Sequence, residues 1–409
     1  MKKNKYDFIM FGATSFVGQI LCKYLISKYG IQGDVSWAAA GRSIAKLETL
    51  RTSLGPKADV LPLIVADVTD ESTLKEMVSQ TGVIISTVGP YALYGEPLVK
   101  VCTETGTDYC DLTGEPQWIR AMILKYEDLA KNSGVRIIHS CGFDSIPSDL
   151  GVYYLQQQAK SRFGEVCTHI KMGVKATKGG ASGGTIASVL NVVQEVVTNP
   201  ALRKELANPY SLCPSDHSFS IRQRNINGPV FDSDFDTWTA PFIMAGINTK
   251  IVHRTNALSG NDYSTEFRYD EAMLMKKGFI APLASAGITA GIATFMALAA
   301  IKPTRMILEK IILPKPGEGP SPEAQKKGFF DLRFIGKTPS GKKVTIKVTG
   351  DRDPGYGSTA KMLAETGILL AKTLSKQDKR GGFWTPASAF GNALIERLVA
   401  QAGLMFETI

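Results

Sequence analysis

The sequence has few of the residues that build metal sites or disulfide frameworks. Its 409 residues include six cysteines and four histidines, with no C-x-x-C pair and no zinc-finger spacing. Isolated thiols are typical of a reducing compartment, and no metal site is predicted. The apolar run near the N-terminus covers only Phe8 to Phe11, which is too short for a secretion signal. We therefore expect a cytoplasmic protein.

A concentrated basic region is also missing. Lys and Arg number 47 against 38 Asp and Glu, and this excess of 9 is spread along the chain. Such an excess suits phosphorylated cofactors or anionic lipid, and no nucleic-acid partner is predicted. With 44% hydrophobic and 21% charged residues, the composition is that of an ordinary globular protein. The length suggests two structural units, or three if one is small.

Short apolar runs alternate with helical patterns over about the first 140 residues. This rhythm predicts an α/β protein whose N-terminal domain, 1–150, is a Rossmann-type doubly wound parallel sheet. The strand candidates are Tyr6–Phe11, Val35–Ala40, Val60–Val65, Val83–Thr87, Tyr109–Leu112 and Val135–His139.

The pattern changes after Gly151 and indicates a second, α+β domain. A half-buried hairpin is predicted for Phe329–Ile335 and Lys343–Thr349, which alternate with period two around a Thr-Pro-Ser-Gly turn. Pro314–Pro322 is too rich in Pro and Gly for regular structure, and we expect a surface loop. Further strand candidates are Lys250–Thr255 and Tyr263–Tyr269.

A glycine-rich turn follows the first strand candidate and opens a helix. In a dinucleotide site, the first glycine permits the tight turn and the last lets helix and strand pack closely. Ser15 replaces the middle glycine, so the match is incomplete, and a plain strand–helix turn is the alternative. The helix N-terminus would offer N–H groups to phosphate. The cofactor-binding residues predicted here are Gly12, Ala13, Thr14, Ser15, Phe16, Val17 and Gly18.

The second strand candidate ends in a cation where an NAD site usually has Asp or Glu. Arg42 could pair with a 2′-phosphate, with Ser43 and Lys46 as helpers, so the sequence favours NADP over NAD. The alternative is a solvated arginine at a helix start. Asp67 ends the third strand candidate and is predicted to lie against the adenine or to form a cap.

Two tyrosines follow the fourth strand candidate. Val88, Gly89 and Pro90 end this strand at the sheet edge where a cofactor and substrate meet, and we include them in the cofactor site. Tyr91 or Tyr94 could donate a proton there, or both could simply pack on the rim.

The exit from the first domain supplies further candidates. Asp144 either caps the helix that follows it or faces the interdomain cleft as a catalytic group. His139 and Cys141 could form a nucleophilic pair, but a buried thiol and a satisfied histidine are favoured. A glycine-rich segment could hold an anionic group of the substrate, or form a capped turn. Its residues are Ser182, Gly183, Gly184 and Thr185.

One long run has no charge. Gly278–Ile301 holds 24 uncharged residues, and Lys276, Lys277, Lys302 and Arg305 flank it. The length would suffice to cross a bilayer, but the composition is only marginally apolar and cations on both sides give no orientation. We expect a helix that is buried in the protein, lies at a subunit interface such as a homodimer, or rests on a lipid surface.

Nine motifs are spaced along nearly the whole chain. They are Gly12-Ala-Thr-Ser-Phe-Val-Gly18, Ala40-Gly-Arg-Ser43, Gly89-Pro-Tyr-x-x-Tyr-Gly-Glu-Pro97, Asp111-x-Thr-Gly-Glu115, Gly142-Phe-Asp-Ser-Ile-Pro-x-Asp149, Ser182-Gly-Gly-Thr185, Pro316-Gly-Glu-Gly-Pro320, Asp353-Pro-Gly-Tyr-Gly357 and Gly381-Gly-x-x-Thr-Pro-Ala387. Together they resemble the saccharopine dehydrogenase-like oxidoreductases, and more narrowly the bacterial trans-acting enoyl reductases.

The resemblance implies an NAD(P)-binding Rossmann domain at 1–150, an α+β domain at 151–350 and a C-terminal helical segment, 351–409, that returns to the first domain. It also implies reduction of a carbon–carbon double bond in a lipid or polyketide-type acyl chain, free or carrier-bound, with NADPH as hydride donor. Tyr91, Tyr94 and Asp144 are then the catalytic candidates.

Two other functions stay open. A saccharopine-type amino-acid dehydrogenase would need a cluster of cations to grip substrate carboxylates, and a non-catalytic lipid-surface protein would need none. The second-domain cations available for such a cluster are Arg222, Arg224, Arg254 and Arg268.

Overall fold

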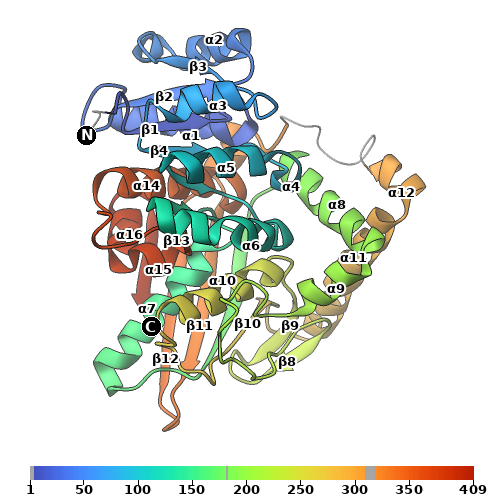
Figure 1. Ribbon diagram of the computed structural model, residues 1–409. Coiled ribbons are helices and arrows are strands. Elements are labelled where there is room, and N and C mark those ends of the chain that lie inside the picture. The colour runs from blue at the N-terminus through green and yellow to red at the C-terminus, as the bar shows by residue number, and fades with distance from the viewer. Residues whose placement is uncertain (1–3, 181–182, 309–317) are drawn as a thin grey trace.

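The computed structural model describes residues 4–180, 183–308 and 318–409. Two seven-stranded sheets organise them, and helices cover both (Figure 1). The first sheet has the strand order β13-β6-β5-β4-β1-β2-β3, with every pair parallel. Its strands are β1 (Phe8–Phe11), β2 (Trp37–Gly41), β3 (Leu63–Val65), β4 (Val83–Ser86), β5 (Asp108–Asp111), β6 (Arg136–Ile138) and β13 (Gly382–Trp384).

Helices cover both faces of this parallel sheet. Strands β1, β2, β4 and β5 are buried along their whole length, because a parallel sheet with two covered faces needs apolar residues on both. The doubly wound Rossmann-type fold is confirmed. One face packs on α1 (Phe16–Tyr29) and α2 (Ile44–Ser53), and the other on α3 (Glu71–Val78), α5 (Glu96–Thr105) and α6 (Pro116–Ser133).

The second sheet is mixed, with the order β14-β12-β11-β7-β10-β9-β8. Only the central β7–β10 pair is parallel. The predicted hairpin is confirmed: Lys337 pairs with Lys343, and Val344, Ile346 and Val348 are buried on one face. The strands are β7 (His169–Lys178), β8 (Val230–Asp232), β9 (Thr237–Pro241), β10 (Arg268–Leu274), β11 (Phe329–Lys337), β12 (Lys343–Gly350) and β14 (Leu404–Thr408).

Two strand predictions in this domain fail. The strand predicted for Lys250–Thr255 is wrong, because the segment lies inside helix α10 (Ala245–Leu258). This helix is buried almost all round, packed on β10 and on α7 (Ile146–Phe163), so no helical period of polar residues marks it. The strand predicted to start at Tyr263 starts at Arg268 instead, after a turn in which Asn261 and Ser264 have positive φ.

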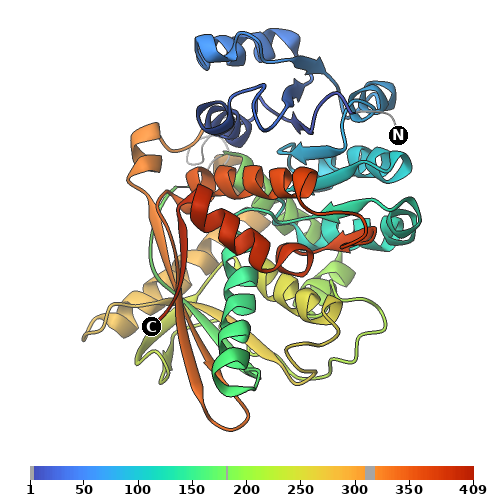
Figure 2. The same ribbon diagram turned by 90° about the vertical axis from the view of Figure 1, so that its left-hand side faces the viewer.

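The C-terminal segment returns to the first domain, as expected. Helix α14 (Thr359–Lys372) packs on α1, β4 and β5, and Figure 2 shows the red C-terminal helices lying against the N-terminal domain. The two short strands of this segment were not predicted. β13 extends the first sheet and β14 the second, so the chain ties the two sheets together. The other elements here are α15 (Pro386–Phe390), α16 (Asn392–Arg397), η3 (Pro354–Ser358) and η4 (Leu398–Ala402).

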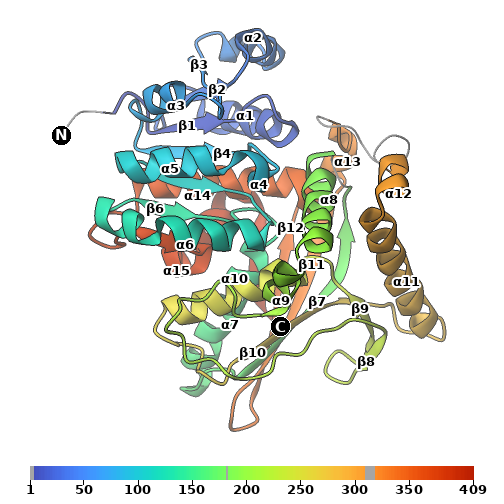
Figure 3. The ribbon, with the colours of Figure 1, turned by 45° about the vertical axis from the view of Figure 1, so that its right-hand side comes forward.

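The uncharged run forms helix α11 (Ala281–Ala300), on the outer edge of the molecule (Figure 3). It packs on β9 and on α8 (Gly183–Thr198), but only 11% of its most apolar window is buried. The expectation of a helix buried within the protein is therefore wrong. Of the predicted loop at Pro314–Pro322, residues 314–317 lie outside the described part. The remaining elements are η1 (Pro56–Ala58), α4 (Tyr91–Tyr94), α9 (Pro200–Ala207), α12 (Lys302–Ile307) and α13 (Pro322–Lys326).

Candidate functional site

A cavity of about 980 Å³ opens at the carboxyl edge of the parallel sheet. The ends of β1, β2 and β4 form one end of it, and α8, α9, α10 and Met296 of α11 form the other. Cofactors of doubly wound folds bind at this edge. Most of the predicted cofactor-binding residues line the cavity: Gly12, Thr14, Ser15, Phe16, Val17, Arg42, Ser43, Asp67, Val88, Gly89 and Pro90.

The two motif glycines lie where a Cβ would collide with neighbouring atoms. Gly12 has φ +88°, and a Cβ on it would lie 2.8 Å from the Thr87 hydroxyl oxygen. A Cβ on Gly18 would lie 2.2 Å from the Gly12 carbonyl oxygen, well inside contact distance. Gly18 and Ala13 are buried beneath the turn and do not line the cavity. They shape the turn, as the motif predicts, without being placed to touch a ligand.

Ser15, the departure from the glycine motif, has a structural role. Its side chain caps α1 by accepting the Gly18 N–H, and its Oγ lies 2.9 Å from the Thr87 Oγ1. Thr87 in turn donates to the Gly12 carbonyl, 3.0 Å away. The serine therefore couples the turn to the end of β4. The N–H groups of Phe16 and Val17 are in the first helical turn, where no intrahelical acceptor exists, so they remain available to a phosphate.

Two cations stand at the end of β2. Arg42 and Lys46 are exposed and line the cavity, and their side chains form no hydrogen bond or ion pair with any residue that the structure describes. Ser43 caps α2 through the Lys46 N–H. Asp67 accepts the N–H and hydroxyl of Thr69, which hold the pKa of its carboxyl below its usual value. The glycine turn and the two cations lie at the end of the cavity where a dinucleotide binds in such folds.

The two tyrosines of α4 differ in availability. Tyr91 is buried, and its hydroxyl donates to the Ser86 carbonyl at 3.0 Å, while burial raises its pKa well above the usual value. Tyr94 is 44% exposed, lines the cavity, and its hydroxyl has no partner among the described residues. Of the pair, Tyr94 is the one free to reach a ligand.

Asp144 lies on the cavity wall with an unpartnered carboxyl. Its Oδ2 would lie 3.1 Å from a Cβ on Gly114, and no described group donates a hydrogen bond to it. Burial raises the pKa of this carboxyl to about 6. Asp144 therefore holds a proton at mildly acidic pH and can give it up near neutrality.

Glu115 belongs to one of the sequence motifs, but the sequence predicted no functional role for it. It is buried and lines the cavity, and its two oxygens accept the N–H groups of Tyr91 and Ala92 at 2.9 Å. The Ser188 hydroxyl of α8 donates to it at 2.8 Å. Burial raises the pKa of Glu115 against these hydrogen bonds. Glu115 thus fixes α4 and α8 to each other across the cavity, a role visible only once α8 is in place.

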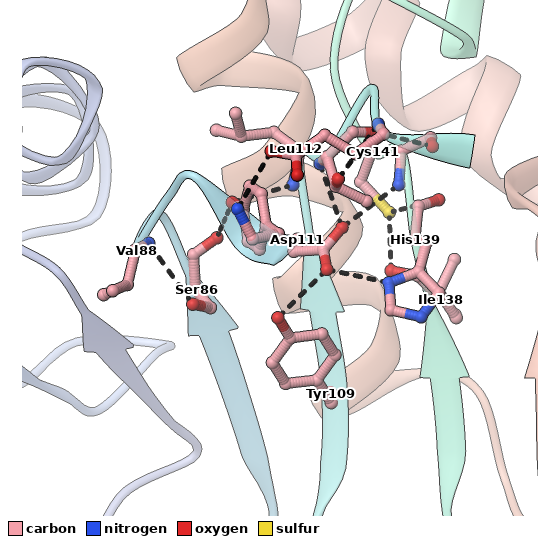
Figure 4. A network of polar contacts seen from close by, with 12 residues as sticks. Ser86, Val88, Tyr109, Asp111, Leu112, Ile138, His139 and Cys141 are labelled. Atoms are coloured by element: carbon pink, nitrogen blue, oxygen red, sulfur yellow. Dashed lines mark hydrogen bonds and ion pairs between the residues drawn. The ribbon is translucent and has the colours of Figure 1, made fainter. Parts of the chain in front are cut away.

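His139 and Cys141 do not form a reactive pair. Figure 4 shows His139 Nδ1 on the Asp111 carboxylate, 2.7 Å away, and the Cys141 thiol donating to the Ile138 carbonyl. Tyr109 donates to the same Asp111 oxygen at 2.9 Å. Neither His139 nor Cys141 lines the cavity. The network braces the ends of β5 and β6, and the buried thiol agrees with the structural interpretation favoured from the sequence. The histidine is only half satisfied, because its Nε2 is buried without a hydrogen-bond partner among the described residues.

The glycine-rich segment reaches the cavity through its described part. Gly183, Gly184 and Thr185 line the cavity at the start of α8, and Ser182 lies outside the described residues. The Thr185 Oγ1 is 3.0 Å from the Tyr356 hydroxyl. No described anion-binding cation accompanies these three residues, so a role in substrate binding stays a prediction.

The far end of the cavity is apolar. Among the described residues that line it, the cations are Arg42 and Lys46, both at the opposite, β2 end. A substrate with an extended apolar part fits this end better than one with several charges. Its walls are Val189, Val192, Val193, Leu206, Ile243, Met244, Ile247 and Met296.

Comparisons with known proteins agree with this geometry. Residues 8–138 match the family described as saccharopine dehydrogenase NADP binding domain. A Mycobacterium tuberculosis protein with the provisional name trans-acting enoyl reductase is 39% identical over 99% of this chain and 97% of its own. The trans-acting enoyl reductase of Mycobacterium ulcerans is 35% identical over 98% and 97%, respectively. The chain belongs to the trans-acting enoyl reductase family, within the saccharopine dehydrogenase-like proteins.

Membership in this family makes the protein an NAD(P)-dependent oxidoreductase with an NADP-binding domain. Among solved structures, an apo saccharopine dehydrogenase (L-Glu forming) from Saccharomyces cerevisiae matches 98% of this chain and 99% of its own. The TM-score is 0.55 at 14% identity, so this likeness supports the fold alone. The fold of this trans-acting enoyl reductase family member is therefore similar to that of a saccharopine dehydrogenase.

Proposed function

We propose that the protein reduces the carbon–carbon double bond of an enoyl lipid or polyketide-type substrate, with NADPH preferred over NADH. The observation that carries the proposal is a single cavity with a glycine-lined cationic end and an uncharged apolar end. When bound, NADPH supplies the hydride that such a reduction needs. The names of the similar mycobacterial proteins support the same reaction.

The preference for NADPH rests on Arg42 and Lys46. Because neither side chain forms a described hydrogen bond or ion pair, both can take an added phosphate without breaking such a contact. The Arg42 charge also helps to lower the pKa of the nearby Asp67 carboxyl. A guanidinium matches the geometry of phosphate oxygens. The N–H groups of Phe16 and Val17, at the start of α1, would face the pyrophosphate.

The proton for the substrate is assigned to Asp144, with Tyr94 as the competing donor. Reduction adds one hydride to the β-carbon and one proton to the α-carbon, so the site must hold a transferable proton. Asp144 has an unpartnered carboxyl with a pKa of about 6, which suits proton transfer near neutral pH. Tyr94 is free but exposed, and the Tyr91 hydroxyl is already used on Ser86.

An amino-acid dehydrogenase fits the cavity less well. Such an enzyme needs cations around its substrate carboxylates, and none of the second-domain arginines named for that role lines the cavity. Arg254 is buried, with Glu127 and the Leu212 and Phe383 carbonyls as partners. Arg224 pairs with Asp232. Both arginines are held by contacts within the fold.

The six cysteines support a cytoplasmic setting for the reaction. All six are free and buried, and no disulfide joins them. Burial raises the pKa of several of these thiols, Cys22 to about 12, so they are protonated and unreactive at neutral pH. A chain that keeps six free thiols suits a reducing compartment.

Turnover on defined substrates tests the proposal. We expect NADPH oxidation with a trans-enoyl thioester and a much slower rate with an amino acid plus a 2-oxo acid. The readout is loss of NADPH absorbance together with mass-spectrometric detection of the saturated thioester. NADPH oxidation with only the amino acid and 2-oxo acid would replace the enoyl reductase proposal with the amino-acid dehydrogenase.

A further inference from the structure

Helix α11 presents an apolar face to the outside of the protein. An exposed helix in a globular protein normally turns charged residues outward, and α11 has none. Its mean hydropathy reaches 1.7, and it is long and apolar enough to cross a membrane by length and composition. One stripe packs inward: Ser285 donates to the Thr239 carbonyl, and Ala299 packs with Leu190 and Val193 of α8.

The opposite face is open. Large apolar side chains gather at its N-terminal end, where Phe279 is fully exposed and Ile280 and Leu283 are each more than 70% exposed. A Cβ placed on Gly287 or Gly291 would point into open space. Beyond the helix, Ile301, Met306 and Ile307 are exposed as well. Among the residues that the structure describes, no element covers this apolar face.

A membrane span is excluded by the sheet. Strand β10 precedes α11 in the chain and β11 follows it, and both strands pair with β7 in one sheet. A helix that crossed a bilayer between them would leave β10 and β11 on opposite sides. The 20-residue helix can therefore meet a bilayer only from the side, along its surface.

The charges around α11 indicate what covers it. The stretch 272–308 contains no Asp or Glu, whereas Lys276 and Lys277 precede the helix and Lys302 and Arg305 follow it. Lys277 pairs with Asp236, and Lys276 and Lys302 are exposed with no described ion-pair partner. Cations at both ends of an apolar face match the anionic headgroups and acyl boundary of a lipid surface.

The same charges disfavour a second copy of the chain. Two α11 helices packed face to face bring cations against cations, whether they run parallel or antiparallel, and the stretch supplies no acid to offset them. We propose that α11 docks the protein on the surface of an anionic lipid bilayer, with Phe279, Ile280 and Leu283 inserted and the flanking cations on the headgroups.

This docking would also place the cavity near lipid. Met296 of α11 lines the apolar end of the cavity and is itself 40% exposed on the docking helix. If the enoyl reductase activity proposed above holds, an acyl chain could pass between the bilayer and the cavity beside this residue. The docking proposal itself stands on α11 alone and does not depend on the reaction.

Flotation of the full chain with vesicles tests the docking. We expect it to float with vesicles of phosphatidylcholine mixed with phosphatidylglycerol, and much less with phosphatidylcholine alone or in high salt. The triple variant Phe279→Ser, Ile280→Ser, Leu283→Ser should lose roughly tenfold or more of the binding. The double variant Lys276→Gln, Lys302→Gln should lose the preference for anionic vesicles.

The control removes equally exposed apolar side chains elsewhere. Val60 and Leu124 are 65% and 70% exposed on the first domain, so Val60→Ser with Leu124→Ser should float like the unaltered protein. All substituted residues are exposed, and melting curves verify that the variants fold. Absence of flotation, or flotation that the triple variant leaves unchanged, would overturn the proposal. A dimer in solution that the triple variant dissociates, without flotation, would assign α11 to a second copy.

Discussion

The two ends of the cavity are built in different ways. At the β2 end the ligand would lie against the glycine turn. A Cβ on Gly12 would clash there with the Thr87 and Val88 side chains, and a Cβ on Gly18 with the Gly12 carbonyl. At the other end it would meet mainly apolar side chains, such as Val189, Val192 and Met296, from helices of the second domain. The first end is therefore intolerant of change, whereas the second can alter its shape and selectivity without loss of the fold.

The largest effect is expected at the β2 end. Gly18→Ala puts a Cβ 2.2 Å from the Gly12 carbonyl and must distort the turn, so NADPH binding measured by calorimetry should fall below detection. Gly246→Ala is the matched control, because Gly246 also lines the cavity but has open space around its Cβ position. Equal NADPH affinity in both variants would contradict the steric account of the turn.

Loss of the proposed proton donor should have the next largest effect. Asp144→Asn keeps the shape of the side chain without an acidic proton, and kcat should fall by roughly 10²–10³ while NADPH affinity is retained. In the unaltered protein kcat should decline as pH rises past about 6, because the carboxyl loses its proton there. If Tyr94→Phe lowers kcat by this factor and Asp144→Asn leaves kcat unchanged, Tyr94 is the proton donor.

Cofactor selectivity should change more modestly. Arg42→Ala removes a charge-assisted contact to the additional phosphate, so the Kd for NADPH should rise about 10–100-fold. The Kd for NADH should stay within error, because that cofactor has no phosphate at this position. If the affinities for NADPH and NADH fall equally, Arg42 stabilises the site but does not bind the additional phosphate.

A substitution at the apolar end of the cavity should change the substrate selectivity without abolishing activity. Val192→Phe fills part of the apolar end, and kcat/KM for a long-chain enoyl thioester should drop about tenfold relative to a short-chain one. NADPH affinity serves as the internal control. A uniform loss for both chain lengths would show that the acyl chain lies elsewhere.

The smallest expected effect is on stability. Burial raises the Asp144 pKa from 3.8 to about 6, so the folded state favours the protonated carboxyl. Ionisation therefore costs stability, which is present at low pH and lost as pH rises through about 6. Asp144→Asn should stabilise the protein by at most ~3 kcal/mol at pH 8, raising Tm by a few degrees, and change little at pH 4. A lower Tm at pH 8 would contradict the buried, unpartnered carboxyl.

The first domain was predictable because its signals are local. Each strand of the doubly wound sheet is a continuous apolar run, and the glycine turn and Arg42 follow directly from single strands. In the second domain, α10 looked like a strand because a helix buried on several sides shows no polar period. Strands β13 and β14 are three and five residues long and gain their partners only from distant parts of the chain.

The candidate site was likewise predictable where its signals are local and not where they depend on tertiary contacts. Most residues at the cofactor end of the cavity were predicted from local motifs. The difference between Tyr91 and Tyr94 was not, because it comes from burial and from the hydrogen bond of Tyr91 to the Ser86 carbonyl, which no local pattern encodes. The link from Glu115 to Ser188 joins residues 73 positions apart. The exposed face of α11 is also a tertiary property, since the same uncharged run would suit a buried helix.

Isotope transfer tests the central claim most directly. The protein is incubated with a trans-enoyl thioester and NADPH that carries deuterium at the transferable position, and the product is analysed by mass spectrometry and NMR. We expect a saturated thioester with one deuterium on the β-carbon and a solvent-derived proton on the α-carbon, as the central claim requires. An unreduced thioester, with the deuterium still on the cofactor, would contradict it.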